Sequence, residues 1–523
     1  MRREWVRFAW AIGFGLLLTS IPSLYGCWNV PSESSWTGML TRNTADVNGY
    51  LGIIEEIRQG HLRTRNLFTA EPHPPFQVRP YYMLLGLMGR LFPAISTVTW
   101  MEIGRFISVA TLLILTAIIV RRLFSYLREQ LLAFFVVCFG SGLGWTFLVN
   151  DPPDLRIVET STFLTLLSPP LYSISLSLVV GILLLLDSCW RVVDQKRAFR
   201  FAGCAGILAM WLGFDRPFSI ATIGLTVGGL FLIETIRDRR ISIRILLSFL
   251  PVLLGAAVAL SYQLWCLQNI EVYAEWNRQH YLLSPELHRL LFALGLLLPL
   301  AFLGVRLLFR SRSRLSVVLC CYAVSSLILS HLPVQFQERF LEGLPLSVSL
   351  PAASGLITLL NRIHQGSRWI LSGMVCVFVL SVSSAVVFVR DCKAIGRQSA
   401  PQYMLDPVLN GMRELAKLAR PEEAIFSAEA TGNFIAAYAA RPVVLGHRIQ
   451  TSNYGEKRLL VLKFFQTQAK DPLAEELFRK SRARWLFWGH EEARLAKDAF
   501  EPKQAPFLQK EYSNEFVTLY RLR

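Results

Sequence analysis

The sequence carries little charge for its length, since Asp, Glu, Lys and Arg make up only 17% of its 523 residues. Hydrophobic residues make up 53%, and the mean hydropathy is +0.40. A water-soluble globular protein needs more polar surface than this composition supplies. The composition therefore excludes an ordinary soluble enzyme and favours an integral membrane protein.

Several signatures of common functions are also absent. The nine cysteines lie mostly in apolar segments without paired spacing, so they predict neither a disulfide framework nor a zinc site. No G-x-G-x-x-G segment joins a strand pattern to a helix pattern, which leaves nucleotide binding without support. The chain has no internal repeat and no low-complexity linker. Its chemistry must therefore be sought in individual polar residues of an apolar chain.

Long apolar runs dominate the sequence, and a run of about 20 residues can span a bilayer. Six uncharged runs reach this length: Phe8–Gly26, Leu131–Val149, Thr160–Leu186, Ile245–Ile270, Gly343–Asn361 and Trp369–Val389. Five runs are shorter: Phe106–Val120, Phe201–Phe214, Pro217–Ile233, Leu290–Val305 and Leu315–Ser330. Together they predict about eleven transmembrane helices. We expect the first run to be a retained span, because it is longer than the apolar part of a typical signal peptide.

The positions of the basic residues predict the topology. The net charge of +17 arises largely from clusters in every second loop, near residues 2–7, 121–128, 191–200, 237–244, 306–314 and 362–368. Positive charge is enriched in cytoplasmic loops. The pattern predicts a multi-pass protein of the plasma (inner) membrane with a cytoplasmic N-terminus, surrounded by membrane lipids and binding no nucleic acid. The loops at 28–102, 150–160, 266–289 and 331–342 and the tail from about residue 391 would be extracytoplasmic.

The composition changes once, near residue 391, where charged residues become frequent and long apolar runs end. Helical spacing follows at 407–418, 431–440, 456–469, 473–482 and from 491, and strand patterns at 424–427, 442–445, 485–488, 508–512 and 516–522. The predicted fold is an all-α polytopic membrane domain over residues 1–390 and a small extracytoplasmic α/β domain over residues 391–523. The tail is open to a structural, substrate-shaping or catalytic role.

The first outer loop, residues 28–102, is far longer than a connection between spans requires. An amphipathic helix is predicted from about Asp46 to Gly60, with Glu55 and Glu56 on its solvated face. The prolines of EPHPP at 71–75 favour an extended segment, and a short apolar helix is predicted over 80–92.

Asp46 is the first candidate for chemistry in this loop. An outward-facing carboxylate at the membrane boundary can remove a proton from an acceptor hydroxyl or amine, or hold a divalent cation. The alternative is that Asp46 caps the helix. Tyr50, one helical turn later, is a candidate substrate-binding residue.

Glu71 and His73 lie two residues apart in the same loop. A carboxylate and an imidazole can contribute to substrate binding or to a metal site, but two ligands do not make one. The alternative is an ordinary solvated loop.

Further polar residues occur beside the other predicted outer boundaries. Asp154 and Glu159 in the second outer loop can supply acid/base chemistry, and Asp215 with Arg216 forms a boundary charge pair. Arg339 in the fourth outer loop suits contact with a phosphate. Loop solvation, a local salt bridge and internal pairing of Arg339 are the respective alternatives.

These features together resemble the GT-C superfamily of membrane glycosyltransferases, which includes protein O-mannosyltransferases, oligosaccharyltransferases and lipid A aminoarabinose transferases. The similarity lies in NTADVNGYLGIIEEIRQGH, PYYMLLGLMGRLF, GRFISVATLLILTAIIVRRLF and QERFLEGLPLSVSLPAASGL. It covers most of the chain as architecture, and the first 120 residues or so as motif. The tail has no WWDYG-like signature of the oligosaccharyltransferases, and the family's Asp-Glu pair in the first loop is not reproduced.

The resemblance implies a role for several candidates. Asp46 would be the catalytic carboxylate of the first loop, acting as a base or a metal ligand. Asp154 or Glu159 would be the acid of the second loop, and Arg339 would contact the donor phosphate. The donor would be a sugar on a polyprenyl phosphate, and the acceptor a glycan, lipid or protein. A divalent metal is the one cofactor that the family raises.

The leading hypothesis is therefore an inverting membrane glycosyltransferase that works on the extracytoplasmic face. A transporter or flippase of a lipid-linked substrate is the second hypothesis, although transporters commonly show repeated halves. A non-catalytic envelope assembly protein is the third.

The topology prediction can be tested by fusion. A reporter joined after residue 395 should report an extracytoplasmic location, because an odd number of spans would separate it from a cytoplasmic N-terminus. A cytoplasmic signal would contradict the predicted orientation.

Overall fold

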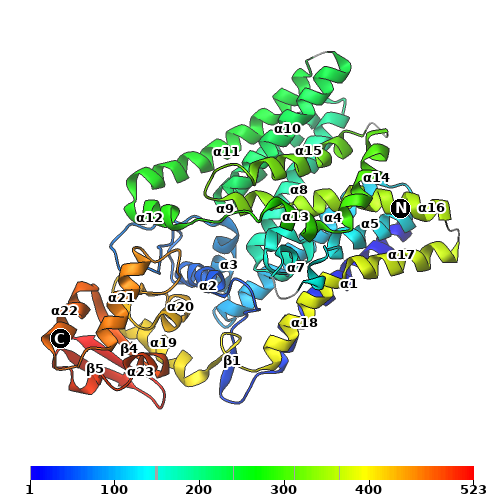
Figure 1. The fold of residues 1–523 in the computed structure, drawn as a ribbon. Coiled ribbons are helices and arrows are strands. Elements are labelled where there is room, and N and C mark those ends of the chain that lie inside the picture. The colour runs from blue at the N-terminus through cyan, green and yellow to red at the C-terminus, as the bar shows by residue number, and fades with distance from the viewer. Residues whose placement is uncertain (1, 148–150, 240, 311–312, 364–365) are drawn as a thin grey trace. The chain divides into compact units, whose positions relative to one another are not determined.

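The computed structural model describes residues 2–147, 151–239, 241–310, 313–363 and 366–523 (Figure 1). The chain divides into two compact units. The helical unit comprises Met1–Pro22, Ile103–Gln263 and Tyr281–Lys393. The mixed unit comprises Ser23–Glu102, Leu264–His280 and Ala394–Arg523.

In the described part of the chain, seven helices are long and apolar enough to cross a membrane. They are α1 (Arg2–Trp28), α4 (Thr97–Leu123), α8 (Pro170–Arg191), α9 (Gln195–Asp215), α10 (Pro217–Asp238), α11 (Ile243–Asn269) and α16 (Leu344–Ile363), the last counted with the preceding turn η4 (Gln337–Leu341). Two bent pairs raise the number to as many as nine: α13 (Leu287–Leu294) with α14 (Leu297–Arg310), at 79°, and α17 (Ser367–Leu380) with α18 (Val382–Gly396), at 56°. The chain is an integral membrane protein, and its described residues contain fewer full-length spans than the eleven predicted.

The difference arises where apolar runs are too short or interrupted. The run Leu131–Val149, whose last two residues lie outside the described ranges, is α-helical only in α5 (Leu127–Phe139), which ends where Gly140 is extended, and contains the short 3-10 helix η1 (Gly144–Thr146) further on. The run Thr160–Leu186 is split between α7 (Thr162–Leu167) and α8. Pro169 and Pro170 separate the two, because proline lacks the amide proton that a continuous helix needs. The helix α15 (Arg314–Leu329) has 16 residues, fewer than a full span needs.

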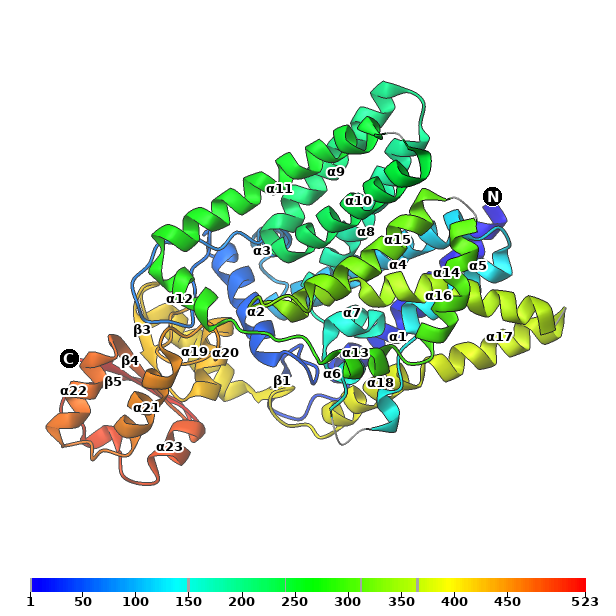
Figure 2. The ribbon, with the colours of Figure 1, turned by 45° about the horizontal axis from the view of Figure 1, so that its top comes forward.

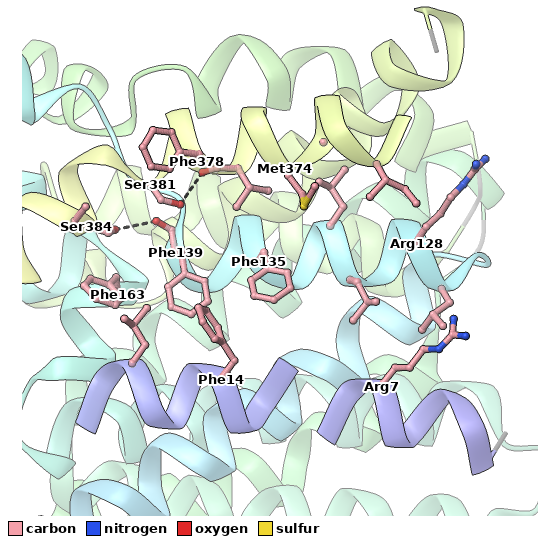
Figure 3. A pocket seen from close by; sticks show the side chains of 18 of the residues that line it. Arg7, Phe14, Arg128, Phe135, Phe139, Phe163, Met374, Phe378, Ser381 and Ser384 are labelled. Atoms are coloured by element: carbon pink, nitrogen blue, oxygen red, sulfur yellow. Dashed lines mark hydrogen bonds between the residues drawn. The ribbon is translucent and has the colours of Figure 1, made fainter. Parts of the chain in front are cut away.

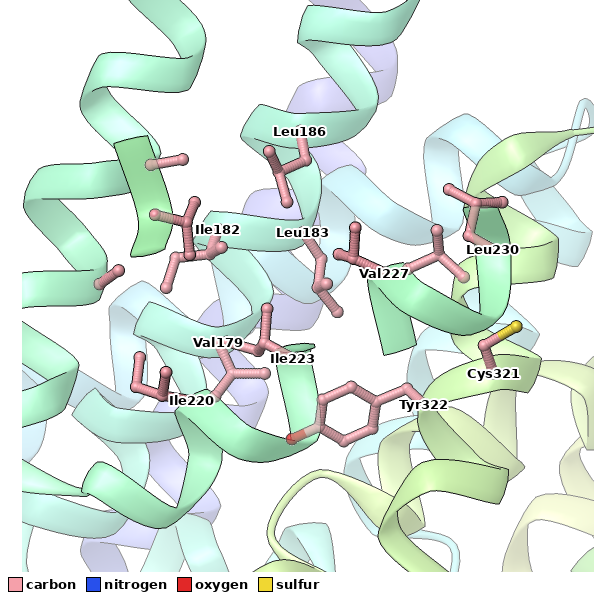
Figure 4. Close-up of a cluster of buried hydrophobic side chains, with 14 of the residues drawn as sticks. Val179, Ile182, Leu183, Leu186, Ile220, Ile223, Val227, Leu230, Cys321 and Tyr322 are labelled. Atoms are coloured by element: carbon pink, nitrogen blue, oxygen red, sulfur yellow. The ribbon is translucent and has the colours of Figure 1, made fainter. Parts of the chain in front are cut away.

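The core of the helical unit forms around α8, of whose apolar window 89% is buried. The helices α9, α10 and α15 surround it, and Figure 2 shows α9 and α10 beside it. Figure 4 shows the side chains that fill this core: Val179, Ile182, Leu183 and Leu186 from α8, Ile220, Ile223, Val227 and Leu230 from α10, and Cys321 and Tyr322 from α15. The spacing of three and four residues along α10 places its four side chains on one face.

The mixed unit contains a four-stranded sheet in the order β3-β4-β6-β5. Its strands are β3 (Ala424–Phe426), β4 (Ala483–Trp488), β5 (Leu508–Ser513) and β6 (Thr518–Leu522), and only β3 and β4 are parallel. Its helices are α19 (Asp406–Leu418), α20 (Glu429–Tyr438), α21 (Tyr454–Phe465), α22 (Pro472–Lys480) and α23 (His490–Ala496). The α/β prediction is confirmed, except that the strand expected at 442–445 is reduced to one bridge between Val443 and Ile425.

The first loop belongs to the same unit as this sheet. It contains β1 (Ser34–Trp36), α2 (Thr44–Arg58) and α3 (Pro80–Leu91), while α12 (Glu271–Gln279) comes from a later loop. β1 pairs with β2 (Tyr403–Leu405) at the start of the tail. α2 packs on α20 so closely that a Cβ atom at Gly52 would lie 2.8 Å from the Ala436 carbonyl oxygen. The sequence did not reveal this packing.

The packing of α2 corrects one prediction about its acidic face. The Glu56 side chain is 1% exposed, and its carboxylate accepts hydrogen bonds from the backbone amide of Arg65 at 2.9 Å and from its guanidinium at 3.2 Å. Glu55 is more exposed and accepts a hydrogen bond from the Thr97 hydroxyl at 2.5 Å. Burial raises the pKa of Glu56 to about 7, although Arg65 favours the charged form. Glu56 is therefore part of the interior.

This burial predicts a pH dependence of stability. Between the ordinary pKa of 4.5 and about 7, Glu56 holds a proton in the folded state that it has lost in the unfolded state. The free energy of unfolding should therefore fall as the pH rises through this window, by up to about 3 kcal/mol from this residue.

The measurement is denaturant unfolding of the purified protein and of Glu56→Gln from about pH 4 to pH 8. The stability of the wild type relative to the variant should decline across the window, because glutamine does not titrate. Glu55→Gln on the same helix is the matched control. A constant difference between wild type and Glu56→Gln would contradict the raised pKa.

Candidate functional site

Asp46 lies in the first turn of α2, where the positive end of the helix dipole favours a carboxylate. The N-cap position belongs to Asn43, whose backbone is left-handed with a φ of 51°. Asp46 is therefore not the capping residue. Its side chain is 27% exposed, so the carboxylate is accessible while its backbone is held in a helix.

The carboxylate of Asp46 meets a histidine from the tail. The distance from Asp46 Oδ1 to His447 Nε2 is 3.0 Å, although 401 positions separate the two residues. His447 Nδ1 accepts hydrogen bonds from the backbone amides of Ile449 and Gln450, at 3.2 and 3.4 Å. An Nδ1 atom that accepts in this way has no proton, so the neutral ring carries its proton on Nε2 and donates it to Asp46.

The tautomer decides what this pair can do. His447 is only 8% exposed, and its ring lies against Phe68 with centroids 5.5 Å apart, so the ring orientation is restricted. Its Nε2–H holds one oxygen of Asp46 in place, and the carboxylate can accept a further proton. As a metal ligand through Nε2, a neutral His447 would need its proton on Nδ1, where the two amides point. The arrangement therefore suits Asp46 as a base and His447 as its orienting partner.

Tyr50 is placed one turn along α2 and stacks on Tyr82 of α3. The ring centroids are 4.7 Å apart and the rings are inclined by 16°. The packing of α2 on α3 thus fixes the Tyr50 ring from one side. A role in substrate binding for Tyr50 stays a prediction.

Glu71 and His73 are held by contacts with their own loop and, for Glu71, with Lys457 of α21. The Glu71 carboxylate accepts hydrogen bonds from Thr69 and from the Lys457 ammonium. Burial alone would raise the pKa of Glu71, but the charge of Lys457 outweighs it and lowers the value. His73 accepts from the Asn66 amide at Nε2 and donates to the Glu71 carbonyl from Nδ1, and burial lowers its pKa. These contacts stabilise the loop.

The helical unit contains a second group of charged residues, around Glu159 in the turn η3 (Val158–Thr160). Its carboxylate is 2% exposed and accepts hydrogen bonds from Arg216 at 2.8 Å and from Arg339 at 2.6 Å. Burial would raise the pKa of Glu159, but the two guanidinium groups lower it. Sequence reasoning named all three residues separately, and the structure places them in one cluster.

Tyr172 completes this cluster. The Arg216 guanidinium lies over its ring, 4.4 Å from the centroid, and Arg339 donates to its hydroxyl at 3.5 Å. Arg216 Nη2 is buried, and no hydrogen-bond acceptor lies within reach of it among the described residues. A buried guanidinium N–H without a partner is costly, so a ligand with anionic oxygen atoms would be stabilised there.

Asp215 and Asp154 have their own contacts in this unit. Asp215 Oδ2 accepts a hydrogen bond from the indole of Trp211 at 2.9 Å, whereas Arg216 pairs with Glu159. Asp154, in α6 (Pro153–Arg156), is 1% exposed, and its Oδ2 accepts from the Gly144 amide at 3.1 Å. Burial raises the pKa of Asp154. These contacts orient the loop beside Asp154, and its catalytic role stays a prediction.

Sequence reasoning missed His447 and Glu342. Glu342 is 4% exposed and accepts hydrogen bonds from the hydroxyls of Ser175 and Ser219. No spacing in the sequence links these residues, because α8, α10 and the turn before α16 bring them together. Within the described ranges, no group of three or more His, Cys, Asp or Glu side chains is arranged to hold a metal ion.

Comparison with known proteins identifies the fold. No protein-family model and no curated protein matches the sequence. Among solved structures, the oligosaccharyltransferase of Archaeoglobus fulgidus in its apo form matches with a TM-score of 0.56 at 14% identity, over 99% of this chain and 74% of that one. ArnT from Cupriavidus metallidurans in the apo state matches with a TM-score of 0.53 at 11% identity, over 98% of each chain.

Both of these proteins have also been solved with lipids. The archaeal enzyme, AglB, was solved with an inhibitory peptide and a dolichol-phosphate, and ArnT was solved bound to undecaprenyl phosphate. The similarity extends over nearly the whole of this chain in both comparisons. At these identities it shows the fold: this chain has the fold of the GT-C membrane glycosyltransferases.

Proposed function

We propose that this protein is an integral-membrane glycosyltransferase that transfers a sugar from a polyprenyl-phosphate-linked donor to an acceptor on the extracytoplasmic face. The observation that carries this proposal is the shared fold over nearly the whole chain with AglB and ArnT, two proteins solved with polyprenyl phosphates. The Asp46–His447 pair and the two arginines at Glu159 supply groups suited to this reaction.

The donor phosphate is assigned to Arg216 and Arg339. Both guanidinium groups pair with the Glu159 carboxylate, the charge of Glu342 also acts on Arg216, and Arg216 Nη2 has no hydrogen-bond partner within the described residues. Arginine binds phosphate through paired N–H groups, and such charge-assisted hydrogen bonds strengthen in a buried site. In this assignment Glu159 positions the two arginines and does not react.

Asp46 is assigned as the base. The nucleophilic oxygen or nitrogen of the acceptor attacks the anomeric carbon, and its proton passes to the Asp46 carboxylate. The bond between the anomeric carbon and the phosphate oxygen breaks, and the polyprenyl phosphate leaves with the electron pair. A single displacement inverts the anomeric centre. The Nε2–H of His447 fixes Oδ1 of Asp46 and so orients the carboxylate.

The same pair gives the tail a role within this proposal. His447 lies between the bridge at Val443 and α21, so the α/β part of the mixed unit supplies the partner of Asp46. The tail would then orient the Asp46 carboxylate through His447. Asp46 itself, in the first loop, would take the proton of the acceptor.

The base assignment predicts the effect of two substitutions. Asp46→Asn should lower the rate of sugar transfer by about 100-fold or more, the usual contribution of a general base. His447→Leu removes one hydrogen bond and should lower kcat by about tenfold. His447→Gln can still donate through its amide and should retain more activity than His447→Leu. The measurement is transfer from polyprenyl-phosphate sugars by purified protein in detergent.

Two results would count against this assignment. Asp46→Asn with full activity would exclude Asp46 as the base, and equal losses in His447→Leu and His447→Gln would exclude the hydrogen-bond role. If the wild type transferred no sugar from any donor but moved polyprenyl lipids across vesicle membranes, a flippase function would replace the proposal.

The phosphate assignment predicts a different kinetic signature. Arg339→Gln should raise KM for the lipid-linked donor by about tenfold or more, with a smaller effect on kcat, because the lost contact is to the bound phosphate. Arg278→Gln, at an exposed arginine of α12, is the matched control and should leave KM unchanged. A loss confined to kcat would contradict a role of Arg339 in donor binding.

A further inference from the structure

The helical unit contains an apolar pocket of about 780 Å³ between α1, α5, α17 and α18 (Figure 3). Its walls are side chains such as Phe14, Phe135, Phe139 and Met374. None of the residues assigned above to sugar transfer lines it. The proposed sugar transfer therefore does not account for this pocket, and we ask which ligand its lining would bind.

One end of the pocket is positively charged. Arg7 of α1 and Arg128 of α5 lie there, both exposed, and the Arg128 guanidinium is 4.9 Å from the centroid of the Trp369 ring (Figure 3). Among the described residues, neither arginine forms an ion pair with a carboxylate. The neighbouring Glu129 is buried and accepts instead from the amide of Asn361, at 3.3 Å.

At the opposite end, the polar side chains among the described lining residues are two serines whose hydroxyl protons are already donated. The hydroxyls of Ser381 and Ser384 donate to the backbone carbonyls of Val377 and Phe139, at 2.7 and 2.8 Å. Figure 3 shows Ser384 near Phe163 and Ser381 near Phe378, at the end away from the arginines. The pocket thus has a cationic mouth and an apolar interior, which is the complement of an amphiphile with an anionic head.

The length of the pocket suits one leaflet of a bilayer. Arg7 and Leu18 mark its extent along α1, and the 11 residue steps from one to the other rise by about 16 Å. Half of the hydrocarbon core of a membrane is about 15 Å thick. A fatty acyl chain of ordinary length therefore fits with its headgroup at the arginines, whereas a long polyprenyl chain would extend beyond the pocket.

We propose that this pocket binds one anionic diacyl phospholipid, with its phosphate between Arg7 and Arg128 and one acyl chain along Phe14, Phe135 and Met374. The arginines belong to clusters that the charge pattern assigns to the cytoplasmic side, so the lipid would come from the cytoplasmic leaflet. Two unpaired arginines favour an anionic over a zwitterionic headgroup. This proposal does not depend on the proposed glycosyltransferase activity.

Native mass spectrometry of the purified, delipidated protein tests the proposal, with dioleoylphosphatidylglycerol, dioleoylphosphatidylcholine and undecaprenyl phosphate as probes. The wild type should retain one phosphatidylglycerol at least about tenfold more tightly than phosphatidylcholine. The double variant Arg7→Gln/Arg128→Gln should lose this preference. Arg200→Gln, an exposed arginine in another cluster on the predicted cytoplasmic side, should keep it.

A further variant tests the apolar part of the pocket. Ala385→Trp places a large side chain among the lining residues and should weaken the retention of both phospholipids. Size-exclusion chromatography of each variant separates lost binding from lost folding. Equal retention of the two phospholipids by the wild type would overturn the proposal, as would an unchanged preference in a folded double variant. Displacement of phosphatidylglycerol by equimolar undecaprenyl phosphate would assign the pocket to the polyprenyl lipid instead.

Discussion

The cost of leaving a polar group unpaired in hydrocarbon governs most of this structure. Backbone amides and carbonyls within a bilayer must bond to each other, so the apolar segments of the chain are helical. The same cost explains where the helices stop. α5 ends at Gly140, and the prolines before α8 interrupt the following run, in each case because the local residues cannot continue the hydrogen-bond ladder.

Charged side chains in the helical unit obey the same rule. Glu159 is almost completely buried and is tolerated because Arg216 and Arg339 both donate to it. Among the described residues Glu342 forms no ion pair within 4.0 Å, and its carboxylate accepts hydrogen bonds from two serine hydroxyls. Groups of this kind are expensive to bury, and in membrane proteins they commonly mark functional sites. The cluster of buried charged side chains around Tyr172 is therefore the strongest candidate for a functional site in this unit.

In the Asp46–His447 pair, backbone amides orient the histidine ring, and the ring orients the carboxylate. The backbone amides of residues 449 and 450 select the tautomer of His447, and the tautomer in turn decides that Asp46 receives a hydrogen bond. A carboxylate held in this way keeps a fixed orientation. Two backbone groups far from Asp46 in the sequence thus restrict what the carboxylate can do.

Much of the architecture could be predicted from the sequence, because local patterns carry it. Apolar runs identified the helices, and strand and helix spacing identified the α/β tail, including β4 at Trp485 and α19 after Asp406. Asp46, Arg216 and Arg339 were recognisable as polar residues beside apolar runs. Burial was not, since Glu56 occupies a helix position that spacing alone marks as solvated, yet it is buried and pairs with Arg65.

The sequence by itself determined the class of protein, the order of its helices and strands and the list of polar residues that chemistry could use. Only the tertiary structure decided which of them meet: Asp46 with His447, Glu159 with Arg216 and Arg339, and Arg7 with Arg128 at one pocket mouth. The physical reason is that helices and strands follow from interactions between near neighbours in the chain. A hydrogen bond between residues 401 positions apart depends on the packing of whole elements, which leaves no periodic signal in the sequence.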